Sequence, residues 1–134
     1  MKKFIKLIAL SLVLVMSVAL LASCAAPNKD PDKAVEALKD NGYVAVKSDI
    51  LGAAGLYALG VKDVDAVVTG TKTEDDKLET VTVIYFKDKD AANTAWEKVQ
   101  DYAEDKKDDN TDWVVKKSGA MIYFGTKQAV KDAK

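Results

Sequence analysis

Cys24 is the only cysteine of the 134-residue chain, and the chain contains no histidine. A cysteine can act as a nucleophile, form a disulfide or accept a modification. Without histidine, Ser-His-Asp and Cys-His catalysis, imidazole acid–base chemistry and the usual zinc sites are excluded. Carboxylates, lysines and tyrosines remain, so we expect no enzymatic activity and no cofactor. A small enzyme that uses Asp, Glu, Lys or Tyr chemistry stays as an alternative.

Two acidic stretches are candidates for metal binding. Asp108, Asn110 and Asp112 are spaced like the first three ligands of a calcium loop. The sixth position of that loop lacks the required Gly, and the twelfth lacks the required Glu. We therefore expect a solvated turn here, a hairpin tip at Glu74-Asp75-Asp76, and no metal site.

The first 23 residues have the charge and hydropathy pattern of an export signal. Lys2, Lys3 and Lys6 precede an apolar run over residues 7–22, which only two serines interrupt. A membrane-spanning helix is the alternative interpretation. The run is short for the ~20 residues that a bilayer requires, and no basic flank follows it.

Leu21-Ala22-Ser23-Cys24 resembles the lipobox of bacterial lipoprotein precursors, in which a branched apolar residue and two small residues precede a cysteine. The resemblance covers residues 1–24. It implies that residues 1–23 are removed and that Cys24 becomes the N-terminus and carries a diacylglycerol thioether. Acylation would consume the thiol, so none would remain for catalysis or for a disulfide.

The lipid anchor implies a location at the cell membrane, outside the cytoplasm. Two acyl chains, each gaining ~0.8 kcal/mol per buried CH₂, make a stable anchor. The lipid bilayer is thus the expected partner of acylated Cys24, in an envelope with one membrane or two.

Composition limits the other partners. The mature chain would keep 17 of the 20 lysines against all 21 acidic residues, and it has no arginine. A slightly acidic chain without arginine is a poor candidate for binding nucleic acid. It also lacks a polybasic segment that would attract anionic lipid.

The chain divides into a signal peptide (1–23), a lipidated cysteine with a short tether (24–29) and one globular domain (30–134). About 105 residues suffice for one domain. They are too few for the two lobes of a solute-binding lipoprotein.

Three helices are predicted. Asp30 caps the first, with Pro31 at its first position and Gly42 at its end. The second begins at Asp88 or Asp90, and its apolar residues recur at three-and-four spacing over 92–103. Thr126 caps the last, with Ala129, Val130 and Ala133 facing inward.

Strands are predicted from β-branched runs at 43–47, 65–72, 78–86, 113–117 and 120–125. The second and third runs form one hairpin and the last two another, joined at Ser118-Gly119. Together these elements predict an α+β fold. It is a single small domain in which helices pack on one face of an antiparallel sheet of about five strands.

Residues 50–61 are apolar throughout and rich in small residues. Our first interpretation is a short buried helix, capped by Ser48 or Asp49 and ended by Gly60. The alternative is an exposed loop that contacts a partner, a ligand or the bilayer.

Neighbouring aromatic residues supply the candidate binding face. Tyr85 and Phe86 must point to opposite faces of the sheet, as must Tyr123 and Phe124. If helices cover one face, one ring of each pair lies on the open face. The rim of this patch would consist of Lys116, Lys117 and Thr82.

These features predict a membrane-anchored envelope lipoprotein whose domain binds or scaffolds another envelope protein. An inhibitory or protective module acting through an exposed loop is an alternative. The sequence leaves the oligomeric state and the identity of the partner open.

Overall fold

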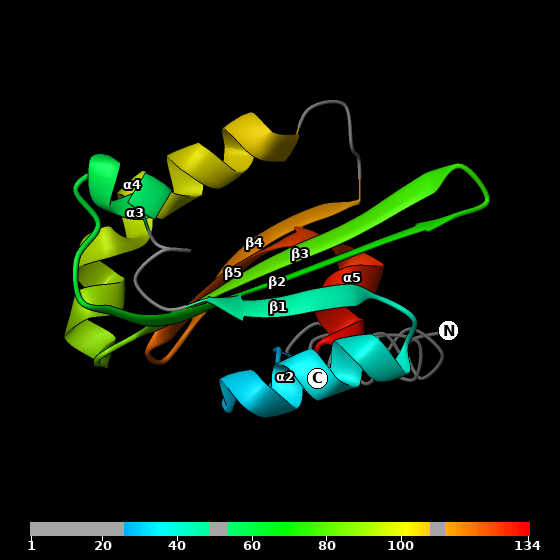
Figure 1. The fold of residues 1–134 in the computed structure, drawn as a ribbon. Helices are drawn as coiled ribbons and strands as arrows, with labels where there is room; N and C mark the ends of the chain where they lie inside the picture. The colour runs from blue at the N-terminus through cyan, green and yellow to red at the C-terminus, as the bar shows by residue number, and fades with distance from the viewer. Residues whose placement is uncertain (1–25, 49–53, 108–111) are drawn as a thin grey trace, which may run out of the picture.

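A five-stranded antiparallel sheet forms the middle layer of the protein (Figure 1). The computed structural model describes residues 26–48, 54–107 and 112–134. In chain order the elements are α2 (Pro31–Asp40), β1 (Val44–Ser48), α3 (Ala54–Ala58), β2 (Val64–Glu74), β3 (Lys77–Phe86), α4 (Lys89–Lys107), β4 (Trp113–Ser118), β5 (Met121–Thr126) and α5 (Lys127–Asp132). The strand order is β1-β2-β3-β5-β4. The predicted α+β class and five-stranded antiparallel sheet are confirmed.

Helices cover both faces of this sheet, so the prediction of helices on one face is wrong. On one face, α2 and α5 enclose a core that includes Leu38, Val83 and Val130; on the other, α3 and α4 enclose a second core around Val99 and Ile84. Figure 1 shows α2 on one side of the strands and α3 with α4 on the other. The physical reason is that the central strands β3 and β5 carry apolar side chains in both alternating sets, which need cover on both sides.

The two hairpins are confirmed. Glu74 pairs with Lys77 across a two-residue turn, in which Asp75 and Asp76 have φ angles of 53° and 62°. Positive φ at both central positions is the feature of the type I′ turn, which matches the twist of the flanking strands. Ser118 pairs with Met121 across the second turn, where Gly119 has φ 59°.

The start of α2 follows local rules. The Asp30 carboxylate accepts a hydrogen bond from the Asp32 N–H at 3.0 Å, and Pro31 occupies the first helical position. Leu38 on this helix is fully buried and packs against Gly70 of β2, where a Cβ would lie 2.9 Å from Leu38 Cδ1. Because Gly70 has no side chain, α2 can approach the sheet closely at this point.

The other two predicted helices also form. The Asp88 carboxylate accepts from the Ala91 N–H at 2.8 Å in the first turn of α4. Thr126 precedes α5 as predicted, but its side chain does not cap the helix. Its hydroxyl instead pairs with the backbone of Thr80 on β3.

The described part of the helix predicted over 50–61 is α3, Ala54–Ala58. Residues 50–53 and the predicted cap Asp49 lie outside the described residues, and Ser48 belongs to β1. The apolar segment then splits between core and surface: Leu56 and Val61 are buried, whereas Tyr57 and Leu59 are 41% and 43% exposed. The described part of the segment is therefore partly core and partly surface.

Residues 26–28, predicted as part of a tether, pack against the domain. The Asn28 N–H donates to the Ala133 carbonyl at 2.9 Å, and Tyr85 Oη donates to the Asn28 carbonyl at 2.6 Å. Ala26 packs against the core beneath α2 and α5. This part of the predicted short tether therefore contacts the last residues of the chain.

Among the described residues, no helix has the length and apolar content needed to cross a membrane.

Candidate binding surface

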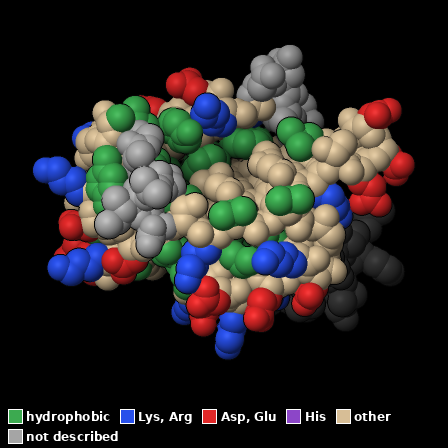
Figure 2. Space-filling view, viewed as in Figure 1, with side chains coloured by type: hydrophobic (Ala, Val, Ile, Leu, Met, Phe, Trp, Pro, Cys, Tyr) green, Lys and Arg blue, Asp and Glu red, His purple; other side chains and the backbone are tan. Residues whose placement is uncertain are grey.

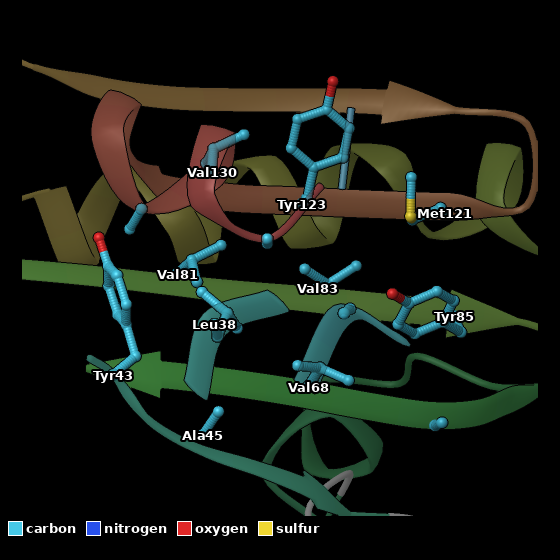
Figure 3. Packing of buried hydrophobic residues seen from close by; sticks show 14 residues of the cluster. Leu38, Tyr43, Ala45, Val68, Val81, Val83, Tyr85, Met121, Tyr123 and Val130 are labelled. Carbon is cyan, nitrogen blue, oxygen red and sulfur yellow. The ribbon is translucent and has the colours of Figure 1, made fainter. Parts of the chain in front are cut away.

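The four aromatic residues of the predicted binding face are all buried. Each neighbouring pair does split between the two faces: Tyr85 and Tyr123 pack under α2 and α5, and Phe86 and Phe124 pack on the α4 side. Their exposed fractions are only 3–7%. Figure 3 shows Tyr85 and Tyr123 among the side chains of the first core, with Leu38 and Val83. The prediction of an exposed aromatic face is therefore wrong, because both faces carry helices.

The hydroxyls of two buried tyrosines bind residues near the two ends of the described chain. Burial raises the pKa of Tyr85, and the nearby Asp30 carboxylate raises it further. Burial also raises the pKa of Tyr43, whose hydroxyl donates to the Asp132 carboxylate at 2.9 Å. Both hydroxyls are thus structural donors in their neutral form.

Part of the α4 face of the sheet carries no described helix. On this face α4 packs on β3, β4 and β5, whereas the principal helix contacts of β1 and β2 are with α2 on the opposite face. The strand register places eight uncharged side chains on this area, which we call the threonine face: Val44, Val46, Thr69, Thr71, Thr73, Leu78, Thr80 and Thr82.

The threonine face exposes large apolar side chains. Val44 is 73% exposed, Leu78 56% and Val46 51%. In Figure 2 the central surface is mostly tan with separate green side chains, and the charged residues gather around its borders. Since β1 is an edge strand of the sheet, the face ends at a strand with one unpaired side among the described strands.

A groove of about 320 Å³ lies where the threonine face meets α4. Its lining includes Thr69, Thr80 and Thr82 of the sheet, together with Tyr102 and Lys106 of α4 and Trp113 of β4. Both rings pack against Phe124, with ring centroids 6.0 and 6.1 Å away. The buried Trp113 Nε1 has no hydrogen-bond partner among the described residues. The groove thus combines hydroxyl groups with aromatic walls.

The structure describes one of the two acidic stretches completely and the other in part. Asp75 and Asp76 form the β2–β3 turn, which confirms the predicted hairpin tip. Residues 108–111 lie outside the described part, and Asp112 is exposed, with its carboxylate 3.8 Å from Lys77 Nζ. In the described ranges, no group of three or more His, Cys, Asp or Glu residues is arranged to hold a metal ion.

A wider hollow of about 680 Å³ lies beside the start of α4 and includes Asp63, Asp88 and Asp90. The Asp88 carboxylate is already engaged with the first turn of the helix. Lys62 and Lys98 also line the hollow, so its wall carries charges of both signs.

Sequence reasoning missed two features of the surface. The threonines recur at every second position over 69–73 and 80–82, and this alternation marks one face of two paired strands. Glu79 gave no such signal, yet it is 7% exposed, with one carboxylate oxygen 3.4 Å from Lys77 Nζ. Its other oxygen is buried without a hydrogen-bond partner among the described residues.

Comparison of the sequence with protein-family models gives no match, and comparisons with curated proteins and with solved structures give none either.

Proposed function

We propose that this protein is a lipid-anchored envelope protein that binds another envelope protein through the threonine face. The proposal has two parts, the anchor at Cys24 and the binding surface, and separate observations support them.

The anchor is supported by the order of features along the chain. The lysines, the apolar run and Leu21-Ala22-Ser23-Cys24 resemble a lipoprotein signal, and the segment predicted to form the globular domain follows it in the chain. Cys24 is the only cysteine, so acylation has no competing disulfide in this chain. This arrangement is typical of an exported domain held at a bilayer by its own N-terminus.

The observation that carries the binding part is the exposure of apolar side chains on an uncharged face. Val44, Val46 and Leu78 are each more than half exposed, and none of the eight side chains of the threonine face is charged. The centres of protein interfaces are depleted in charge and rich in apolar and aromatic contacts. The adjoining groove offers aromatic side chains to such a partner.

The edge strand β1 indicates the form of the partner. An edge strand presents unpaired backbone groups, to which an extended segment can add as a further strand. Val44 and Val46 lie on this strand, so they would contact alternate side chains of the added segment. We therefore propose that the partner contributes an extended, uncharged segment with β-branched or apolar side chains.

The test uses the native acylated chain in its own envelope. A photo-crosslinking residue at Val46 or Thr71 should give one adduct of defined mass, whose peptide is an uncharged extended segment. The same residue at Glu97, exposed on α4, is the matched control and should give none. Adducts at all three positions, or at none, would refute the binding part.

The anchor is tested on the same protein by intact mass. We expect the mass of residues 24–134 plus a diacylglycerol thioether. A chain that retains Met1, or a trimmed chain without acyl groups, would refute the anchor whatever the crosslinks show.

A further inference from the structure

Residues 26–28, at which the described part of the chain begins, lie on the face of the sheet opposite the threonine face. Asn28 binds Tyr85 and Ala133, and both of these belong to the core beneath α2 and α5. The threonine face lies on the other side of the same sheet, the side on which α4 packs. Figure 1 places the C-terminus beside α2, away from α3 and α4.

Three lysines lie on α5 and just after its end on this first face, and we call them the lysine stripe. Lys127 and Lys131 are four residues apart and share one side of α5. Lys134 follows the C-cap of the helix, and its N–H donates to the Lys131 carbonyl at 3.3 Å. All three are exposed, whereas Ala129, Val130 and Ala133 point into the core. Among the described residues, none of the three lysines lies within ion-pair distance of a carboxylate.

The one acidic residue of this segment is turned away from the stripe. Asp132 accepts hydrogen bonds from Tyr43 Oη at 2.9 Å and from Gln128 Nε2 at 3.0 Å. Its backbone carbonyl also faces Asn41 at the end of α2. The Asp132 carboxylate is therefore bonded to Tyr43 and Gln128, and it does not neutralise the three lysines.

The stripe lies next to the point where the anchor would enter. Asn28 Nδ2 donates to the Lys134 carbonyl at 3.2 Å, so residues 26–28 contact the end of α5. Only Ala25 separates Ala26 from Cys24, and two residues of chain span at most about 7 Å. An acylated Cys24 would thus hold the bilayer surface close to the end of the lysine stripe.

We infer that α5 lies against the membrane and that Lys127, Lys131 and Lys134 contact anionic phospholipid headgroups, so that the threonine face points away from the bilayer. The inference rests on the anchor of the proposed function. Each lysine near an anionic leaflet favours this orientation by about fivefold, and three together by on the order of 100-fold. The sequence shows no polybasic run because glutamine, alanine, valine and aspartate separate these lysines. Helix formation brings Lys127 and Lys131 to one side of α5, and Lys134 follows the end of the helix.

The test measures orientation on the acylated mature protein, residues 24–134, in vesicles of phosphatidylcholine with one third phosphatidylglycerol. After acylation of Cys24 the chain has no free thiol, so one introduced cysteine is a unique labelling site. Gln128→Cys reports from α5 and Thr71→Cys from the threonine face; both positions are exposed. A fluorophore at each site is quenched by lipids that carry a nitroxide headgroup.

We expect several times more quenching at position 128 than at position 71. The difference should vanish in pure phosphatidylcholine and in ~1 M salt, where the screening length is about 3 Å. The triple variant Lys127→Gln/Lys131→Gln/Lys134→Gln should lose it. The control Lys89→Gln/Lys98→Gln/Lys107→Gln removes the same charge from exposed positions on α4 and should retain it.

The possible outcomes test the lipid anchor and the orientation separately. A protein without acyl groups that does not float with vesicles refutes the anchor and, with it, the orientation. An acylated protein that floats but shows equal quenching at the two sites overturns the orientation alone. Quenching that survives without anionic lipid, or in the α5 triple variant, also overturns it.

Discussion

The contact between Leu38 and Gly70 predicts a strong coupling between two substitutions. Leu38 is fully buried, and its Cδ1 would lie 2.9 Å from a Cβ at Gly70, with Cδ2 and Cγ at 3.4 and 3.5 Å. Leu38→Ala removes a buried side chain and leaves a cavity, which costs about 2–5 kcal/mol of unfolding free energy. For a domain of this size that is a large share of the ~5–15 kcal/mol available.

Gly70→Ala alone should also destabilise the protein. Overpacking a core costs about 1–3 kcal/mol, and the loss of glycine's backbone freedom returns about 0.5–1 kcal/mol. The net cost is then about 0–2.5 kcal/mol. Leu38 is fully buried in the core between α2 and the sheet, so its side chain can move away from a new methyl group only within the core.

The double variant should be more stable than the sum of the two single effects. Leu38→Ala removes all three atoms that the new methyl group would approach, and this methyl group then fills part of the cavity. We expect a coupling free energy of about 1–3 kcal/mol, measured by urea unfolding followed by circular dichroism. Gly119→Ala is the control, since no atom lies within 4 Å of a Cβ there. Its cost of about 1–2 kcal/mol comes from its positive φ and should add to that of Leu38→Ala. A coupling between Leu38 and Gly70 below about 0.5 kcal/mol would refute the close packing of α2 on β2.

Three further predictions follow from the buried tyrosines and the threonine face. Tyr85→Phe removes the hydrogen bond to the Asn28 carbonyl and should cost about 0.5–1.5 kcal/mol, with faster amide exchange at Asn28; Tyr57→Phe at an exposed position should have no effect. The folded state raises the pKa of Tyr43 and Tyr85 above the ordinary 10.0, so their contribution to stability is complete below that pH and is lost as the pH rises above it. Unfolding free energies measured across pH 10 should therefore fall more steeply in the native chain than in Tyr43→Phe/Tyr85→Phe, and equal slopes would contradict this. Val46→Asp should change stability by less than about 0.5 kcal/mol while it abolishes the crosslink at Thr71; a large loss of stability would mean that Val46 is not on a free surface.

Local signals were sufficient for most of the elements. Asp30 and Pro31 act within the first turn of α2, and Asp88 within that of α4, so neighbouring residues alone predicted these helix starts. The β2–β3 hairpin is likewise determined by residues beside its turn. The polar character of Asp75 and Asp76 marked that turn in the sequence.

Whether helices cover one face of the sheet or both depends on how distant parts of the chain pack, and local patterns do not show this. On β3, Thr80 and Thr82 lie on the same face as Ile84, so one face of one strand changes from open to covered along its length. Alternation shows which residues share a face, but not where α4 stops. The candidate site was therefore placed on Tyr85 and Tyr123, which helices cover, rather than on the threonines.

The docking of residues 26–28 was not predictable for a related reason. Asn28 binds Ala133 and Lys134, more than a hundred residues further along the chain. A short polar segment with a proline is typical of a linker, and only the folded chain brings the two termini together. This contact holds residues 26–28 of the predicted short tether against the domain.

The two proposed surfaces lie on opposite sides of one sheet, and this separation has a physical consequence. Val83 and Ile84 are adjacent on β3, and both are fully buried, one in each core. A binding partner on the threonine face and a bilayer against α5 would thus be separated by two packed layers and would share no side chain. Substitutions at such distant sites add independently. Removing the α5 lysines should therefore change the orientation at the membrane without weakening the crosslink at Val46, and Val46→Asp should leave the orientation unchanged.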